Sequence, residues 1–250
     1  MATLFKPSNP VLRERTFEAV GMPGVEQAMT LNGTVNKTGF LLICAAATAS
    51  WTWHLARTGD PAAVGLPLMG GLIGGLIVAL ATVFKPAWSA VTAPLYALLE
   101  GLVLGGISAI TEARYPGIAI QAVWLTMGTL VVMLLIYRAR LIQATQKFKI
   151  GIVAATGAIC LIYVVSMVLG FFGIAVPKIY DAGPIGILFS VVVVAIAALN
   201  LILDFDLIET GAAQGAPKYM EWYGGFAILV TLIWLYLEIL RLLAKLRSRR

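Results

Sequence analysis

Seven long apolar stretches occupy most of the chain after residue 37, and they limit how it can fold more than any other feature. Five contain no Asp, Glu, Lys or Arg, and the other two are each interrupted by one acid. They are Thr38–Ala56, Pro61–Phe84, Pro86–Thr111, Tyr115–Tyr137, Ile150–Pro177, Ala182–Leu203 and Trp222–Leu240. A helix needs about 20 mostly apolar residues to cross a hydrocarbon core of ~30 Å. Each stretch therefore predicts one membrane-spanning helix.

The composition excludes the other broad classes. Only 12% of the residues are charged and 60% are hydrophobic, whereas a soluble domain is about a quarter charged. Disordered chains have the opposite balance, and the 25 glycines follow no collagen-like period. Because an open sheet or a loop would leave backbone polar groups facing lipid, the spans are expected to be helices. The predicted fold class is all-α: a polytopic membrane protein with a seven-transmembrane-helix bundle.

The chain is expected to divide into three parts. Residues 1–33 form a polar N-terminal tail that lacks the apolar core of a secretory signal, with a short surface helix near Leu12–Val20. Residues 34–246 form the transmembrane domain, and residues 247–250 form a basic C-terminal tail. We expect the N-terminal tail to be cytoplasmic.

The net charge of +6 is interpreted as a topology signal, because Lys and Arg collect in the cytoplasmic loops of membrane proteins. No nucleic acid is expected as a partner. Four bases lie in the N-terminal tail, four between spans four and five, and five after the last span. Seven crossings would divide the bases 10 to 8 between the two sides, whereas a re-entrant last segment would divide them 15 to 3. The sequence leaves both arrangements open.

Several conspicuous residues are interpreted as packing or interface residues. Cys44 and Cys160 each lie inside a span, and His54 ends the first span beside Trp51 and Trp53, as in an interfacial aromatic belt. The glycines of MGGLIGGLI in the second span permit a close helix contact. We recognise no paired nucleophile and base and no metal-type cluster, so neither an enzyme nor a cofactor is expected.

Half of the twelve acidic residues lie in or beside spans. They are Glu100, Asp204, Asp206, Glu209, Glu221 and Glu238. An ionised side chain at the bilayer centre costs at least ~2.5 kcal/mol, so it must face protein or water, pair, or stay protonated. Glu100 is closest to the midplane, beside Gly101. It is either a pore or proton-relay residue, or a protonated Glu bonded to a facing helix.

The acids that close the sixth span point in different directions. Asp204 shares a helical face with Asn200 and Ile208, whereas Asp206 points about 200° away. We expect Asp204 to face the bundle. Asp206 and Glu209 are expected to mark the membrane interface.

Glu238 lies in the last span, and Arg241 follows three residues later. This spacing fits a same-helix ion pair at the membrane edge. It fits a functional acid in the bundle equally well, and the residues alone do not decide between the two.

Three segments carry a family resemblance: LLEGLVLGGIS in the third span, LDFDLIE at the end of the sixth, and PKYMEWYGGFAILVTLIWLYLEILRLL. Together they resemble the transmembrane Bax inhibitor motif family, the last segment its bacterial branch, over roughly residues 30–246. The resemblance implies seven helices with the last one central, in a bacterial inner (plasma) membrane. Members are implicated in Ca²⁺ leak, with two aspartates in the sixth and seventh helices as a pH-sensitive latch. The matching positions are Asp204 and, through LYLE, Glu238.

Such a latch has a clear physical basis where the two acids meet. Two carboxylates in contact share a proton, and its loss adds repulsion, favours opening and leaves oxygens that can contact Ca²⁺ transiently. Straight helices would place Asp204 about 8 Å and Glu238 about 28 Å from the connecting turn. Contact therefore requires an interfacial start to the last helix. Otherwise Asp204 pairs elsewhere, for example with Glu221.

The resulting prediction is a pH-sensitive Ca²⁺ (cation) leak channel in the lipid bilayer, with Asp204 and Glu238 as gate or pH sensor and Glu100 as pore or proton-relay residue. The secondary candidates are Asp206, Glu209, Asn200, Arg241 and Glu221. The alternative, from another class, is a non-conducting membrane regulatory protein that binds other membrane proteins such as a quality-control protease.

Overall fold

The computed structural model describes residues 28–58, 61–173, 179 and 181–249, and these residues form seven long helices. The helices are α2 (Leu31–Thr58), α3 (Gly65–Phe84), α4 (Ser89–Arg114), α5 (Ile118–Arg138), α6 (Gln146–Phe171), α7 (Pro184–Ala213) and α8 (Met220–Ser248). Short 3₁₀ turns, η3 (Pro61–Val64) and η4 (Pro86–Trp88), precede α3 and α4. All seven helices are long and apolar enough to cross a membrane, so the predicted all-α bundle is confirmed. The helix expected near residues 12–20 lies outside the described residues.

The helices are longer than several of the apolar stretches that predicted them. α7 continues ten residues beyond Leu203, through the acids that close the sixth span. A helix satisfies its own backbone hydrogen bonds whether its side chains face lipid or water, so charges end the apolar run without ending the helix. In the same way, α2 begins before residue 34 and α8 extends past residue 246.

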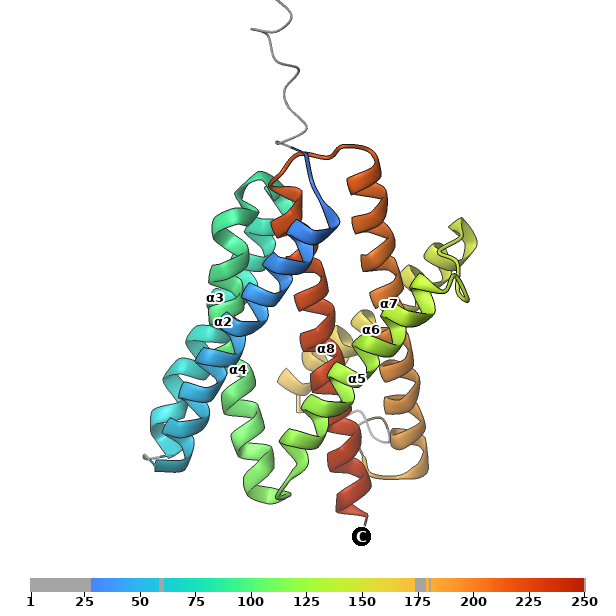
Figure 1. The fold of residues 1–250 in the computed structure, drawn as a ribbon. Helices are drawn as coiled ribbons and strands as arrows, with labels where there is room; N and C mark the ends of the chain where they lie inside the picture. The colour runs from blue at the N-terminus through green and yellow to red at the C-terminus, as the bar shows by residue number, and fades with distance from the viewer. Residues whose placement is uncertain (1–27, 59–60, 174–178, 180, 250) are drawn as a thin grey trace, which may run out of the picture.

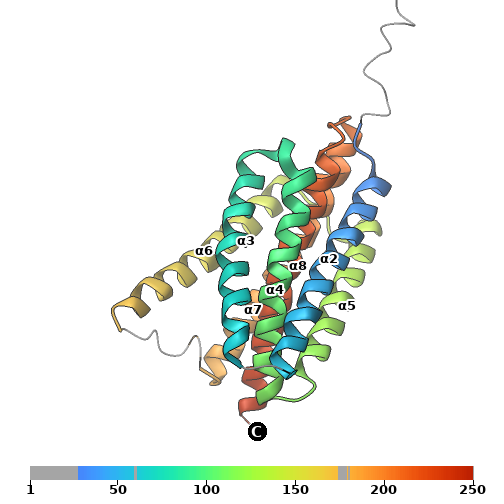
Figure 2. The same cartoon turned by 90° about the vertical axis from the view of Figure 1, so that its left-hand side faces the viewer.

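The last helix runs through the middle of the bundle (Figure 1). In this view α2, α3 and α4 lie on one side of α8 and α7 on the other, whereas α5 crosses in front of α8 and α6 runs behind it. Fifteen of the 29 residues of α8 are buried, more than in any other helix described. Figure 2 shows that α6 leans away from the rest of the bundle.

Glycines bring α4 close to α2 and α3. A Cβ atom at Gly101 or Gly105 would lie 2.3 Å or 2.2 Å from a backbone oxygen of α2, so only glycine fits. Gly71 of α3 would similarly meet the backbone oxygen of Leu99 at 2.6 Å. The glycine motif of the second span therefore packs against α4, although Gly70 faces open space.

The two ends of the helical bundle are distinct. α2 begins at one end, here called the N-terminal end, and the chain finishes at the other, the C-terminal end (Figure 1). Because α8 is one continuous helix between these ends, the last segment crosses the bundle and does not re-enter. The connection between α5 and α6 lies at the N-terminal end, together with the start of α2.

Candidate functional site

Buried polar side chains line one face of the central helix. Thr231, Glu238 and Lys245 are seven residues apart and all are buried. A seven-residue step turns a helix by nearly two full turns, so these side chains share a face. Their partners come from α6, α7 and the connection between them. We call this set the polar seam: Thr156, Tyr163, Ser190, Asn200, Asp204, Thr231, Glu238, Arg241 and Lys245.

Asp204 joins α7 to α8. The Thr231 hydroxyl donates to Asp204 Oδ2 at 2.6 Å. One turn deeper on α7, the Asn200 side chain donates to Thr156 Oγ1 of α6 at 2.9 Å. Asp204 thus faces the bundle interior, as its position beside Asn200 predicts.

Glu238 is 2% exposed and joins α8 to α6. Its Oε1 accepts hydrogen bonds from the Tyr163 hydroxyl at 2.8 Å and from Arg241 Nη1 at 2.7 Å. Arg241 Nη1 also donates to the Tyr163 hydroxyl at 2.8 Å, which closes a three-membered cluster. Glu238 Oε2 is buried and has no hydrogen-bond partner among the described residues. The same-helix ion pair therefore exists, together with a buried oxygen that it does not satisfy.

The two acids of the expected latch are bonded at different levels of the polar seam. Asp204 bonds at the level of Thr231, which precedes Glu238 by seven residues, or ~10 Å of helix rise. The contacts Asp204–Thr231 and Ser190–Lys245 fix the antiparallel register of α7 and α8. This register puts Ala197 of α7 opposite Glu238, so the structure gives each acid its own surroundings.

Glu100 lies outside the polar seam, where α4 packs against α3. A Cβ atom at Gly75 of α3 would lie 2.9 Å from Glu100 Oε1. The Tyr96 hydroxyl lies beside the carboxyl, and the Tyr96 ring packs edge-on against Phe226 of α8 at 5.0 Å. Glu100 is therefore held between α3 and α4, across the central helix from Asp204 and Glu238.

Asp206 and Glu209 bind the end of α5, the start of α6 and the connection between them. Asp206 forms an ion pair with Lys149, and Glu209 accepts from Arg140 at 2.7 Å and from the Tyr137 hydroxyl. Both acids thus point away from the α7–α8 contact. Their interpretation as residues that mark the membrane interface stays a prediction.

A family model described as Bax inhibitor 1 like matches residues 9–248, which include all seven helices. The chain belongs to the Bax inhibitor 1 like family. The resemblance seen in its third, sixth and seventh spans is therefore confirmed. Searches of curated proteins and of solved structures find no match. Family membership and the seven apolar helices together make the chain an integral, multi-pass membrane protein.

In this Bax inhibitor 1 like protein, Glu221 ties the start of α2 to α8. It is fully buried and accepts from the Thr30 backbone at 2.9 Å and the Thr30 hydroxyl at 2.8 Å. Lys37 and Lys218 form ion pairs with the same carboxylate. A Cβ atom at Gly33 would lie 2.2 Å from Glu221 Oε1. Glu221 is thus bound at the N-terminal end and is not a partner of Asp204.

Lys245 is the charged residue of the polar seam that sequence reasoning missed. It is 6% exposed and donates to Ile179 O at 2.7 Å, Gly186 O at 3.0 Å and Ser190 Oγ at 2.9 Å. In the sequence it is one of five terminal bases and looks like a topology signal. The only signal available was its seven-residue spacing from Glu238.

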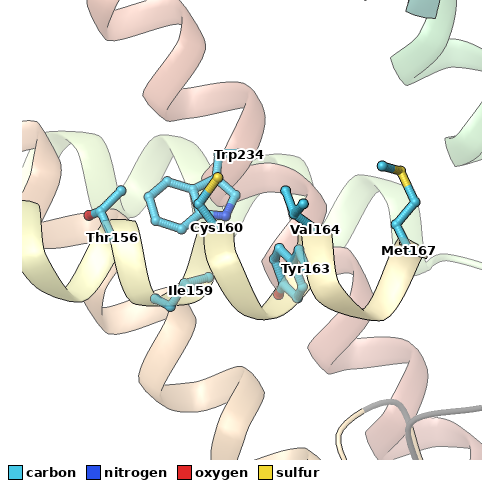
Figure 3. Close-up of a pocket in the computed structure, with 7 residues that line it drawn as sticks. All are labelled: Thr156, Ile159, Cys160, Tyr163, Val164, Met167 and Trp234. Atoms are coloured by element: carbon cyan, nitrogen blue, oxygen red, sulfur yellow. The ribbon is translucent and has the colours of Figure 1, made fainter. Parts of the chain in front are cut away.

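An apolar groove adjoins the Glu238 cluster between α6 and α8 (Figure 3). Its volume is about 350 Å³. It is lined by Thr156, Ile159, Cys160, Tyr163, Val164, Met167 and Trp234. Tyr163 belongs to both the groove and the polar seam, so the position of α6 and the bonding of Glu238 are coupled.

The described residues contain no group of three or more His, Cys, Asp or Glu side chains that could hold a metal ion. The Asp204 and Glu238 levels of the polar seam each supply a single carboxylate, with the hydroxyl of Thr231 or of Tyr163 beside it.

Proposed function

We propose that this Bax inhibitor 1 like protein is a pH-sensitive cation leak channel, with Ca²⁺ as a permeant ion. The observation that carries the proposal is that Asp204 and Glu238 both lie in the polar seam, on the central helix or bonded to it. Buried acids in a membrane are costly and typically belong to ion or proton pathways. Here Glu238 even retains a buried oxygen without a partner among the described residues.

The oxygens of the polar seam suit a divalent cation in passage. Ca²⁺ prefers carboxylate, carbonyl and hydroxyl oxygens. A cation that must leave as well as enter is best served by weak sites in series. Single carboxylates at two levels of the seam, about 10 Å apart along the helix, form such a series.

The pH sensitivity follows from the same acids. Each carboxylate attracts a cation only when it is deprotonated, so flux is expected to rise as pH rises. Because the acids are bonded at separate levels, we propose two gates in series in place of one shared-proton latch. Glu100 is assigned no part in conduction, because it lies between α3 and α4.

Reconstitution in liposomes that contain a Ca²⁺ indicator tests the proposal. Wild-type flux should rise between pH 6 and pH 8, and Asp204→Asn and Glu238→Gln should each lower it. Asp206→Asn is the matched control, because it makes the same chemical change two residues away and outside the polar seam. Glu100→Gln should also leave flux unchanged. Absence of wild-type flux at every pH would refute the channel.

A second candidate function is a non-conducting regulator that binds another membrane protein. The position of α6 favours it, since this helix leans out of the bundle beside the apolar groove (Figure 2). A protein without flux that co-purifies with one membrane protein, and loses it when groove residues change, would support this role. We also propose a bacterial inner membrane as the location, which fractionation of the producing cells would test.

A further inference from the structure

Lys245 carries a positive charge inside the bundle, and none of its three hydrogen-bond acceptors is charged. They are two backbone oxygens, of Ile179 and Gly186, and the hydroxyl of the buried Ser190. Buried lysines usually contact a carboxylate, because an uncompensated ammonium loses its hydration without recovering it. Three oxygens saturate the donors of the ammonium but do not cancel its charge.

One base and two acids lie around Lys245, but the three hydrogen bonds of its ammonium go to none of them. Arg241, one turn earlier on α8, adds to the positive potential at Lys245, whereas Glu238 and Asp181 oppose it. Arg241 already donates a hydrogen bond to Glu238 Oε1. The acid charge of the seam is therefore concentrated towards Asp204, and its basic charge towards Lys245.

The helix register sets the length of this charge gradient. Asp204 to Ser190 and Thr231 to Lys245 are both fourteen-residue steps, which correspond to ~21 Å along the helices. A cation that enters from the N-terminal end would meet the Asp204 level first, then the Glu238 level, and finally the Lys245 ammonium. The first two levels offer ligands, and the third repels it.

We propose that Lys245 is a charged plug that closes the C-terminal end of the polar seam to cations and water. This inference rests on the proposed function, because it assigns a gate to the same pathway. When Lys245 leaves its three acceptors, the repelling charge is withdrawn. The oxygens of Ile179, Gly186 and Ser190 are then available as ligands for the passing cation.

The flux test removes the charge of Lys245 and compares the resulting Ca²⁺ flux with the flux after a neighbouring charge is removed. Lys245→Gln should raise Ca²⁺ flux by about tenfold or more, because a fixed positive charge in a narrow pathway is a strong barrier to cations. The Lys245→Arg protein keeps the charge, so its Ca²⁺ flux should be well below that of the Lys245→Gln protein. Arg247→Gln is the matched control, because Arg247 is two residues away and binds Pro116 O at 2.5 Å and Gln121 at 3.0 Å outside the seam.

A second measurement detects opening without relying on Ca²⁺ flux. Ala197→Cys places a thiol in the seam opposite Glu238, in a protein whose Cys44 and Cys160 are replaced by alanine. A water-soluble methanethiosulfonate reagent should label this thiol about tenfold faster in the Lys245→Gln protein. Elution on size exclusion and the midpoint of thermal unfolding show whether each variant is folded.

The outcomes separate the plug from the channel. Faster labelling without flux in any protein, wild type included, would support the plug and refute the Ca²⁺ leak. Unchanged labelling and unchanged flux in folded Lys245→Gln protein would overturn the plug and leave the leak in place. Equal increases in flux and labelling rate for Arg247→Gln would also overturn the plug, because the effect would then come from removing any positive charge near this end of the protein.

Discussion

The Thr231 hydroxyl of α8 donates to the Asp204 carboxylate of α7 at 2.6 Å, seven residues before Glu238 on the same helix. This contact separates the two acids that the family resemblance would pair. A methyl group in place of the hydroxyl tests it, because valine has the shape of threonine. Thr231→Val should lower the free energy of unfolding by about 1–3 kcal/mol, since Asp204 loses its donor.

The measurement is the unfolding transition of purified protein in mixed micelles. Thr231→Ser, which keeps the hydroxyl, should cost less than Thr231→Val. In the Asp204→Asn background the Thr231→Val change should cost less than in the wild type. Because the asparagine side-chain oxygen still accepts a hydrogen bond, equal costs in both backgrounds would show that the charge of Asp204 adds nothing to this hydrogen bond.

The Glu238–Arg241 pair gives a second prediction. Arg241→Gln should destabilise the protein by about 3 kcal/mol, near the lower limit for a broken buried pair, because Arg241 is itself 39% exposed. The double variant Glu238→Gln with Arg241→Gln should recover most of this loss. Arg140→Gln is the control, since it breaks an exposed pair with Glu209 and should cost below about 1 kcal/mol. Similar losses for both arginines would contradict the burial of Glu238.

Two glycines of α2 test the packing around Glu221. Gly33→Ala should destabilise the protein by about 1–3 kcal/mol, because the new methyl group would overlap the Glu221 carboxylate. Gly39→Ala, on the same helix, meets nothing within 4 Å and should be neutral or stabilising by up to about 1 kcal/mol. Thermal unfolding of the two variants side by side is the measurement. The prediction fails if Gly33→Ala is tolerated as well as Gly39→Ala.

The close contact of α2 with α4 gives a fourth prediction. Gly105→Ala should lower the unfolding midpoint, because its Cβ atom would lie 2.2 Å from the Ala49 backbone oxygen and would push the helices apart. Gly128→Ala in α5 has open space around it and serves as the control. No difference between the two midpoints would argue against the close crossing.

The fold could be predicted from the sequence because a chain that crosses lipid must satisfy its own backbone hydrogen bonds, which a helix does. Seven apolar runs long enough to cross predicted seven helices, and the structure has them. The runs did not predict where helices end, because the α7 backbone continues past Asp204 on its own hydrogen bonds. Charge marks the membrane boundary, which is a different limit from the helix boundary.

The site was harder to predict because it depends on register. Asp204 and Glu238 were recognised as buried acids, yet their partners depend on how α7 slides along α8. Thr231 is an ordinary residue in the sequence and becomes a partner only through that register. Lys245 was hidden by its neighbours, since four other bases surround it at the end of the chain.

The Glu221 carboxylate has a consequence for synthesis of the protein. Its partner Thr30 is 191 residues away in the sequence and directly precedes α2, which packs against α8. At about 5–20 residues per second, roughly 10–40 s separate the emergence of these residues from the ribosome. Of the seven described helices, the one at the centre of the bundle is made after the other six. Those six helices are therefore synthesised before the helix that they pack around.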